Sequence, residues 1–533
     1  MASRFVRRVR TASGAVAVQV VTKERGKVVA VEHVGSAHTD AELALLVEAA
    51  RGVLRPGQGE FGFGVLAGPA VSTADVADWT RRSGLLPSEP SGRGRRRVVA
   101  GGGRVVGTAS LVLWRVLADA YETLGFDAVA DETFKALVLG RVAEPTSKAD
   151  TIRVLGELGV AAPSLRTVFR CLRRSVEDDY RDILARACLA WSVGAAGHAS
   201  LVLYDVTTLH FESETEDELR RVGMSKERRV DPQIQVGLLV DPSGFPLELC
   251  CFEGNKAETR TLIPTLEGFV QRHGLRDLVV VADAGMLSAS NLNALEDAGF
   301  RFIVGSRITK APYDLAEHFA LKGTYFADGQ ILESARVMGA GTAARRRRVV
   351  YQYSFTRSKR DNRAINAMVE RAEKVADGRR PLKKDRFVKV VGATKGVDWE
   401  LVDRARQLAG LKGYVTNLPK RTMGGPAVIS AYHDLWQVEK SFRMAKSDLR
   451  ARPVFHHQRE SIESHLTIVF AALAVSRHLQ DTTGLSIKKL VTTLRPIRSA
   501  TIDINGQKLT LDPEIPPAIR NLLTKLGQPP EGH

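Results

Sequence analysis

The sequence is poor in cysteine and in long apolar runs. Four cysteines occur among 533 residues, and none has the C-x-x-C or Cys/His spacing of a zinc site. A disulfide framework is not indicated either, which fits a reducing cytoplasm. No stretch is long and apolar enough to span a bilayer, and the basic N-terminus lacks the apolar core of a signal peptide. These features argue against secreted, zinc-finger and membrane proteins.

Acidic residues are fewer than basic ones. Asp plus Glu number 60 against 77 Lys plus Arg, which gives a net charge of +17 and a pI near 9.8. This balance points to a polyanionic partner such as nucleic acid, although ribosomal and membrane-surface proteins share it. The hydrophobic content of 44% is that of a globular protein, and the length indicates several domains.

The first part of the chain, residues 1–105, predicts a small unit followed by a linker. Two strands are expected at 15–21 and 27–34, and a short helix is expected to begin near Thr39. Segment 87–104 is rich in Gly, Pro and Arg, which indicates a basic linker that could touch phosphates or serve only as a solvated hinge.

Residues 106–197 are expected to be almost wholly helical and to bind DNA. Segments 147–158 and 164–174, joined by a turn that contains Gly159, have the layout of a helix-turn-helix. A second helix rich in arginine could enter a major groove, although any helical bundle offers such pairs of helices. The arginines that we assign to DNA binding here are Arg166, Arg170 and Arg173.

The periodicity becomes strand-like near residue 199. LVLYDV, IQVGLLVD and PLELCCFE predict three antiparallel strands, and helix, strand, helix and strand follow up to about residue 305. This order predicts an α/β fold with a ribonuclease H-like mixed sheet and helices on both faces. We assign residues 198–308 and 411–480 to the two parts of this core.

Two further regions complete the predicted organisation. Residues 309–410 are more basic and less regular, which predicts an inserted β-rich α+β subdomain with phosphate contacts. The candidates for these contacts form one run, namely Arg345, Arg346, Arg347 and Arg348. Residues 481–533 predict a hairpin at Asn505-Gly506 and a last helix, and we consider this tail a candidate for dimerisation.

Three acidic residues stand where such a sheet would gather them. Asp205 lies in the first strand, Asp283 directly follows the apolar strand LVVVA, and Glu439 lies on a late helix. Acids at the ends of adjacent buried strands are costly unless a cation compensates them. Oxygen ligands without Cys or His favour Mg²⁺ or Mn²⁺, and two such ions about 4 Å apart would promote phosphodiester cleavage and transfer.

Segment 431–453 predicts one amphipathic helix that carries Glu439. Its apolar residues recur at three- and four-residue steps and predict a buried face, formed by Leu435, Val438, Phe442, Ala445 and Leu449. Tyr432, Glu439 and Lys446 lie seven residues apart and would form a row beside this face. Each of the three alone is more often an ordinary surface group.

Three motifs in this order resemble a known family. YDVTTLHFE around Asp205, VADAGMLS around Asp283 and Tyr432-x2-Leu435-x3-Glu439-x6-Lys446 are similar to insertion-sequence transposases of the Asp-Asp-Glu type. Within them, the sequence resembles the group named for a Tyr-Arg-Glu-Lys signature. The resemblance covers roughly residues 147–480.

The resemblance implies roles for individual residues. The three acids would bind two divalent ions, and Tyr432 and Lys446 would hold the phosphate next to the cut. Leu435 occupies the place of the signature arginine, and Arg443 could supply the lost charge or simply pair with Glu439. Trp399 in the insertion could stack on a flipped base, although an isolated tryptophan is more often part of a core.

The resemblance also implies a function. The protein would bind the terminal inverted repeats of its element, cut them through hairpin ends and join them to target DNA, as a homodimer that bridges two double-stranded ends. Its expected location is the bacterial cytoplasm, associated with the nucleoid and without membrane contact. The alternatives are a ribonuclease H-like DNA nuclease without strand transfer and an inactive DNA-binding regulator.

Overall fold

The structure is a computed structural model of the chain, which divides into two compact units, Met1–Val98 and Val99–His533. The predicted helix near Thr39 and the predicted linker up to residue 103 lie outside the described residues. The described residues are 2–10, 16–24, 27–37, 104–196, 201–212, 215–223, 231–257, 260–283, 288–306, 315–383, 385–391 and 394–528.

The first unit contains a three-stranded antiparallel sheet. Its strands, in spatial order, are β1 (Ala2–Arg10), β2 (Val16–Glu24) and β3 (Lys27–Ala37). The predicted hairpin is confirmed as β2 and β3, and Val18, Val20 and Val21 are buried. Strand β1 was missed, because four arginines in ASRFVRRVR obscure the apolar alternation that indicates a strand.

The helical prediction for the next region is confirmed. The helices are α3 (Leu111–Thr123), η1 (Phe126–Val129), α4 (Glu132–Ala143), α5 (Lys148–Glu157), α6 (Leu165–Glu177) and α7 (Tyr180–Ala196). Ser147 and Ser164 cap α5 and α6 by accepting hydrogen bonds from the backbone N–H groups of Asp150 and Thr167. The long helix α15 (Arg459–Thr483) contacts α3, α4, α6 and α7, so it ties this region to the rest of the second unit.

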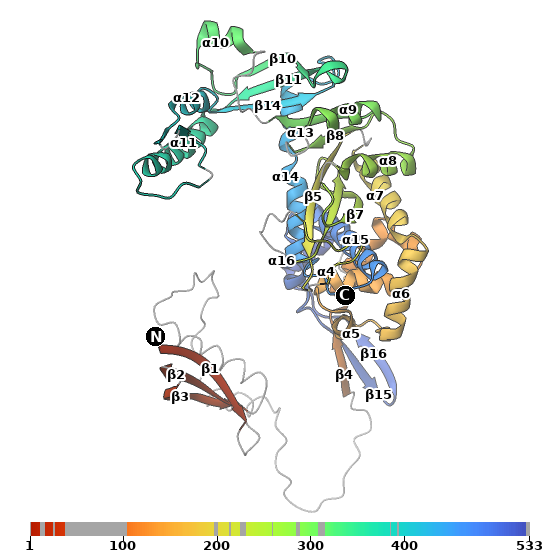
Figure 1. The fold of residues 1–533 in the computed structure, drawn as a ribbon. Coiled ribbons are helices and arrows are strands. Elements are labelled where there is room, and N and C mark those ends of the chain that lie inside the picture. The colour runs from red at the N-terminus through yellow and green to blue at the C-terminus, as the bar shows by residue number, and fades with distance from the viewer. Residues whose placement is uncertain are drawn as a thin grey trace, which may run out of the picture. The chain divides into compact units, whose positions relative to one another are not determined.

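An eight-stranded mixed sheet dominates the second unit (Figure 1). Its spatial order is β10-β11-β14-β9-β8-β5-β6-β7, and only the β5–β8 and β8–β9 pairs are parallel. The strands are β5 (Leu201–His210), β6 (Gln233–Val240), β7 (Pro246–Glu253), β8 (Val279–Ala282), β9 (Arg301–Ser306), β10 (Ile331–Met338), β11 (Arg345–Tyr353) and β14 (Leu411–Thr416). The predicted order of three antiparallel strands followed by helix, strand, helix and strand is therefore confirmed.

Helices cover both faces of this sheet. Tyr204 and Thr207 lie three positions apart on β5, so their side chains point to opposite faces. The Tyr204 hydroxyl donates to Thr261, directly before α8 (Leu262–His273), whereas Thr207 accepts from Lys446 on the opposite face. Three further helices of the core are α9 (Ala289–Asp297), α13 (Gly425–His433) and α14 (Trp436–Arg443).

The predicted inserted subdomain is only partly separate. Strands β10 and β11 extend the main sheet through β14, because Val349, Val350 and Tyr351 of β11 are buried in the same core as β5 and β8. A second core of Ile365, Val369, Phe387 and Val402 holds the remaining elements together. These are α11 (Phe355–Ala376), β12 (Val388–Val391), β13 (Thr394–Val397) and α12 (Trp399–Gln407), while α10 (Ala316–Lys322) precedes β10.

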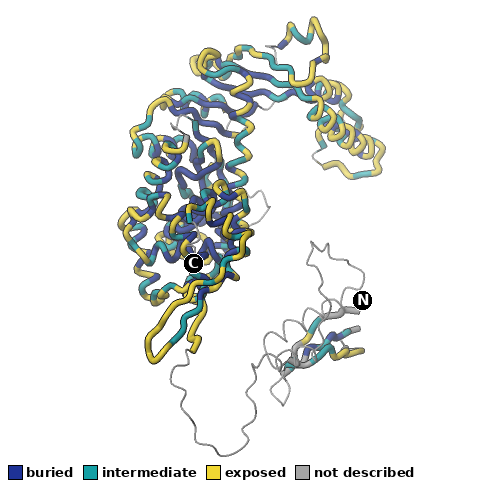
Figure 2. Tube along the Cα trace, turned by 180° about the vertical axis from the view of Figure 1, so that it is seen from behind, coloured by how far each residue is buried: buried dark blue, intermediate teal, exposed yellow. Residues whose placement is uncertain are grey.

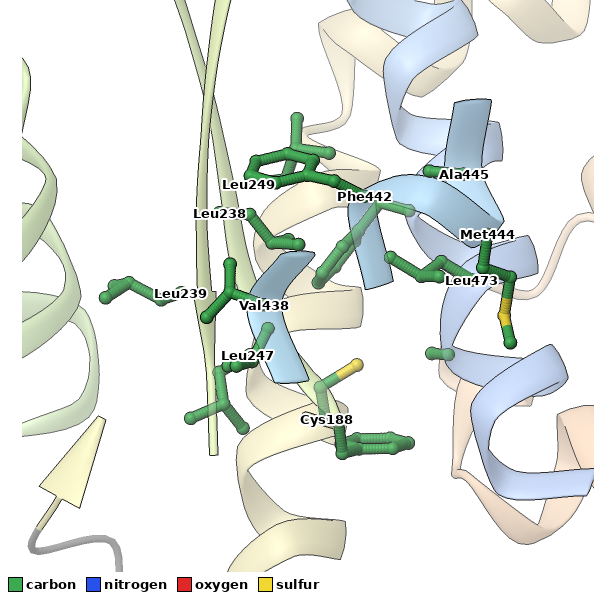
Figure 3. Packing of buried hydrophobic residues seen from close by; sticks show 14 of the residues in the cluster. Cys188, Leu238, Leu239, Leu247, Leu249, Val438, Phe442, Met444, Ala445 and Leu473 are labelled. Carbon is green, nitrogen blue, oxygen red and sulfur yellow. The ribbon is translucent and has the colours of Figure 1, made fainter. Parts of the chain in front are cut away.

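The single helix predicted for 431–453 is wrong. Helix α13 ends at His433, α14 begins at Trp436, and the π-helix η6 (Met444–Asp448) follows. The predicted apolar face is nevertheless confirmed, with Leu435 partly buried and the other four residues buried. Figure 3 shows Val438 and Phe442 pointing toward Leu238 and Leu247 of the sheet. The apolar residues therefore pack against the core as predicted, although the segment is made of three helical elements and not of one continuous helix.

The C-terminal segment forms a helix, a hairpin and a final helix. They are α16 (Ile487–Leu494), β15 (Ser499–Ile504), β16 (Gln507–Leu511) and α17 (Pro517–Lys525). The predicted turn is confirmed, because Asn505 and Gly506 both have positive φ. Strand β15 also pairs with β4 (Arg104–Ala109), so the end of the predicted linker is a strand; most of β4 and all of β16 are exposed (Figure 2). Among the described helices, none is both long and apolar enough to cross a membrane.

Candidate active site

Two aspartates lie side by side at the end of the parallel strand pair. Residue Tyr204 of β5 is in register with Ala282 of β8, and these are the last paired positions. The next residue on each segment is an aspartate, Asp205 and Asp283. Neighbouring strands are about 4.8 Å apart, so the two carboxylates start from adjacent backbone positions. Asp205 is half-buried and Asp283 is exposed.

Tyr432 reaches the second aspartate from α13. Its hydroxyl donates to Oδ1 of Asp283 at 2.8 Å. The Tyr432 ring packs edge-on against the Tyr414 ring, with 4.9 Å between the two centroids. The Lys412 ammonium lies 5.1 Å from the centroid of the Tyr432 ring. Gly305 of β9 makes this placement fit, because a Cβ there would collide with the Tyr432 hydroxyl. Strands β14 and β9 therefore orient the phenol of Tyr432 toward Asp283.

Lys446 reaches the face of the sheet that carries the first aspartate. Its ammonium donates to Oγ1 of Thr207. Thr207 and Asp205 are two positions apart on β5, so their side chains point to the same face. Lys446 lies on the π-helix η6, and its stem borders an apolar pocket that also contacts Phe442 and Leu238. The ammonium of Lys446 therefore lies on the sheet face of Asp205, while the aliphatic part of the Lys446 side chain covers the core.

Glu439 lies on α14 with an exposed side chain, and α14 contacts β5. Within the described ranges, no three His, Cys, Asp or Glu side chains form a group that could hold a metal ion. The structure thus brings the helix of Glu439 to the strand of Asp205, but it does not gather the three carboxylates into one ligand set. The oxygen-only donors do fit Mg²⁺ or Mn²⁺ in kind.

Leu435 and Arg443 lie at the two ends of α14. Leu435 is the residue before the helix and packs partly against the main core, so it offers no charge. Arg443 is exposed as the last residue of α14. In the part of the chain that the structure describes, no ion pair joins Arg443 to Glu439.

The arginines of α6 lie on an exposed face. Arg166, Arg170 and Arg173 are all exposed, while Val168 and Leu172 are buried against the core. Arg173 has Glu177 at 3.4 Å, a pair between two exposed side chains. This surface therefore remains a candidate for DNA contact.

The arginine run on β11 behaves differently. Arg347 is buried, and its Nε lies 2.8 Å from Glu296, so this guanidinium is not available to a phosphate in the described conformation. Arg345 pairs with Asp297 at 2.7 Å, and Arg348 pairs with Glu333 at 2.9 Å. Among the four arginines of this run, Arg346 alone is exposed.

Trp399 lies at the start of α12 and is 52% exposed. It is therefore not a core tryptophan, and stacking on a base stays a prediction. Sequence reasoning missed Thr207, Lys412 and Tyr414, which contact the predicted Lys446 and Tyr432. Thr207 lies within the YDVTTLHFE motif, whereas no local sequence signal marks Lys412 or Tyr414.

Two aspartates follow the last paired positions of the parallel strands β5 and β8, and a tyrosine contacts one of them while a lysine reaches the sheet face of the other. This arrangement defines the class as an α/β domain with an acidic site. The sequence model of the transposase DDE domain matches residues 196–475, just over half of the chain. This protein therefore belongs to the DDE transposase family. No curated protein matches the sequence.

Two solved structures are similar at low identity. A piggyBac transposase synaptic complex with hairpin DNA is 10% identical with a TM-score of 0.36, covering 74% of this chain and 81% of that chain. A Mos1 transposase paired-end complex with left transposon end is 11% identical with a TM-score of 0.15, covering 48% and 71%. Both TM-scores are below 0.5, and the family assignment rests on the sequence match.

Proposed function

We propose that this DDE transposase cuts and joins DNA in a metal-dependent, cut-and-paste manner as a member of the Tyr-Arg-Glu-Lys signature group. The strands β7-β6-β5-β8-β9 would be its ribonuclease H-like core, with three antiparallel strands followed by two parallel ones. The observation that carries the proposal is the convergence of Tyr432 on Asp283 and of Lys446 on the face of Asp205.

Each residue has a proposed role. Asp205, Asp283 and Glu439 would hold two Mg²⁺ or Mn²⁺ ions, whose chemistry is activation of the attacking oxygen and stabilisation of the leaving oxygen. Lys446 would bind a phosphate oxygen beside the cut through its ammonium. The Tyr432 hydroxyl would orient Asp283 by the hydrogen bond that it donates.

DNA recognition would come from the exposed arginines of α6, as in a helix-turn-helix that places its second helix in the major groove. The capped helices α5 and α6 and the positive φ of Gly159 between them support this proposal. The protein would bind the terminal inverted repeats of a bacterial insertion sequence, and a homodimer would bridge two ends near the nucleoid.

An end-cleavage assay tests the proposed site. The substrates are DNA duplexes with the repeats that flank the gene, and the variants are Asp205→Asn, Asp283→Asn and Glu439→Gln. We expect all three to bind DNA and to lose detectable cleavage in Mg²⁺, because each removes one anionic ligand. Asp377→Asn, an exposed residue after α11, is the matched control and should cut normally.

Two outcomes would contradict the assignment. Normal cleavage by Glu439→Gln would remove that helix from the site, and joint loss of folding and binding would make the acids structural. Hairpin ends on a denaturing gel separate strand transfer from simple nuclease activity. Their absence, with cleavage retained, would favour the nuclease alternative.

A further inference from the structure

A polar pocket of about 450 Å³ lies at the junction of β11, α11 and α13. Arg357 and Arg360 of α11 line it together with Thr356, and Gln352 and His433 contribute from β11 and α13. Thr356, Arg360 and His433 are exposed, so the pocket is open to solvent. The roles proposed above for the three acids and for the α6 arginines do not involve the residues that line this pocket.

The pocket carries positive charge that its surroundings neutralise only in part. Asp328 also lines it, but Oδ1 of Asp328 accepts from the backbone N–H of Phe355 at 2.8 Å. Arg360 has Asp361 at 3.7 Å, a long pair in which the arginine side chain is 71% exposed. In the described residues, Arg357 takes part in no ion pair. Exposed pairs of this kind contribute little, so both guanidinium groups can take an anionic ligand.

A chain of contacts connects this pocket to the proposed active site. Nε2 of His433 lies 3.3 Å from the Tyr414 hydroxyl, and Tyr414 packs against Tyr432, which donates to Asp283. Burial raises the pKa of Tyr414, and the charge of Arg357 opposes that rise. His433 of the pocket and Asp283 therefore each contact one tyrosine of the same aromatic pair.

Leu435 stands directly before the helix of Glu439 and carries no charge. Leu435 packs there against the core. A DNA strand that passes through the active site carries one negative charge per phosphate. We infer that this pocket holds a phosphodiester of the DNA strand next to the cut, with Arg357 and Arg360 supplying the cationic contacts that Leu435 cannot make. Their planar guanidinium groups suit bidentate binding of phosphate oxygens.

This inference rests on the proposed function, and binding to end DNA tests it first. The variants are Arg357→Gln and Arg360→Gln, measured by fluorescence anisotropy without divalent ions, so that no cutting occurs. We expect each to weaken binding about tenfold and to lower the salt slope by about one. Because Arg360 is largely exposed, its replacement is not expected to affect folding, which a melting curve verifies.

Arg371→Gln is the matched control. Arg371 is an exposed arginine of the same helix, 14 residues after Arg357, which is about 21 Å along the axis. It carries the same charge change and should leave both affinity and salt slope unaltered. An equal loss in Arg371→Gln would mean a general charge effect and would overturn the inference.

Replacing one DNA phosphate at a time by an uncharged methylphosphonate identifies the phosphate that Arg357 contacts. Methylphosphonate is placed at one phosphate at a time on both sides of the cut, and each duplex is titrated with wild type and Arg357→Gln. At the contacted phosphate, we expect the loss seen with wild type to vanish in the variant, because both changes remove one interaction. Additive losses at every position would overturn the inference.

The two proposals fail in different ways. If the wild type cuts its ends while the pocket variants behave as Arg371→Gln does, the pocket inference is wrong and the proposed function stands. If the wild type neither binds nor cuts any end, both are wrong.

Discussion

Two arginine-rich segments of this protein look alike in sequence and differ in structure. On α6, Arg166, Arg170 and Arg173 recur at three- and four-residue steps and share one exposed face. On β11, four consecutive arginines alternate between two sides, so that Arg346 is exposed and Arg347 is buried. The period of the secondary structure, rather than the number of charges, decides which arginines can meet DNA.

The buried side of β11 has a specific environment. The carboxylate of Glu296 on α9 forms ion pairs with two arginines, with Nε of Arg347 at 2.8 Å and with Nη1 of Arg345 at 3.2 Å. A charge this deep is tolerated only with a partner. The run on β11 is therefore largely a structural ion-pair network between a strand and a helix, whereas the α6 face is a candidate binding surface.

The largest expected effect is on stability, from Arg347→Ala. This change leaves Glu296 with only Arg345 and should lower the free energy of unfolding by about 3 kcal/mol. Urea unfolding measures it, and Arg346→Ala on the same strand is the control, with an expected change within about 0.5 kcal/mol. Equal effects of the two variants would contradict the assigned alternation.

A second test concerns Lys148, a half-buried cation that, unlike Arg347, pairs with no acid in the described part of the chain. Lys148 contacts His456 at 2.5 Å and His465 at 3.3 Å, and in the described part of the chain it has no acidic partner. Burial, followed by the charge of Arg141, lowers the pKa of Lys148 to about 7. The unfolded chain then binds a proton that the folded chain has lost, from about pH 7 up to the normal lysine pKa of about 10.4.

Stability should accordingly rise with pH through that window and fall as pH decreases toward about 7. We expect a gain of about 1–2 kcal/mol between about pH 7 and about pH 8.5, measured by urea unfolding. Lys148→Met should remove this part of the pH dependence. The same slope in the variant would mean that another group titrates there.

The smallest expected effect on stability comes from α6. Arg170→Gln should change the free energy of unfolding by less than about 0.5 kcal/mol, because the side chain is exposed. The same variant should weaken binding to end DNA and lower the salt slope by about one. A normal salt slope with normal affinity would remove α6 from the proposed interface.

Local patterns predicted much of the core. Short apolar runs located β5, β6 and β7, and Asn505-Gly506 located the last turn. The apolar residues Val438 and Phe442 were correctly expected to be buried. These features depend on side chains close in sequence, which is why the sequence reveals them.

Other features depend on partners far away in the chain. The break between α13 and α14 has no glycine or proline at its site, so it does not follow from local propensity. Strands β10 and β11 join the main sheet only because β14, about sixty residues later, lies between them and β9. Burial of Arg347 likewise depends on Glu296 of another element.

The sequence by itself determined the strand and helix periods, the basic charge and the order of the Asp, Asp and Glu motifs, because all of these are properties of neighbouring or ordered residues. Only the tertiary structure decided that Asp205 lies beside Asp283, that Tyr432 and Lys446 reach them from separate helices, and that Arg347 of the β11 run is turned inward. Those relations arise from strand register and helix docking, which join residues that are 51 to 239 positions apart in the chain.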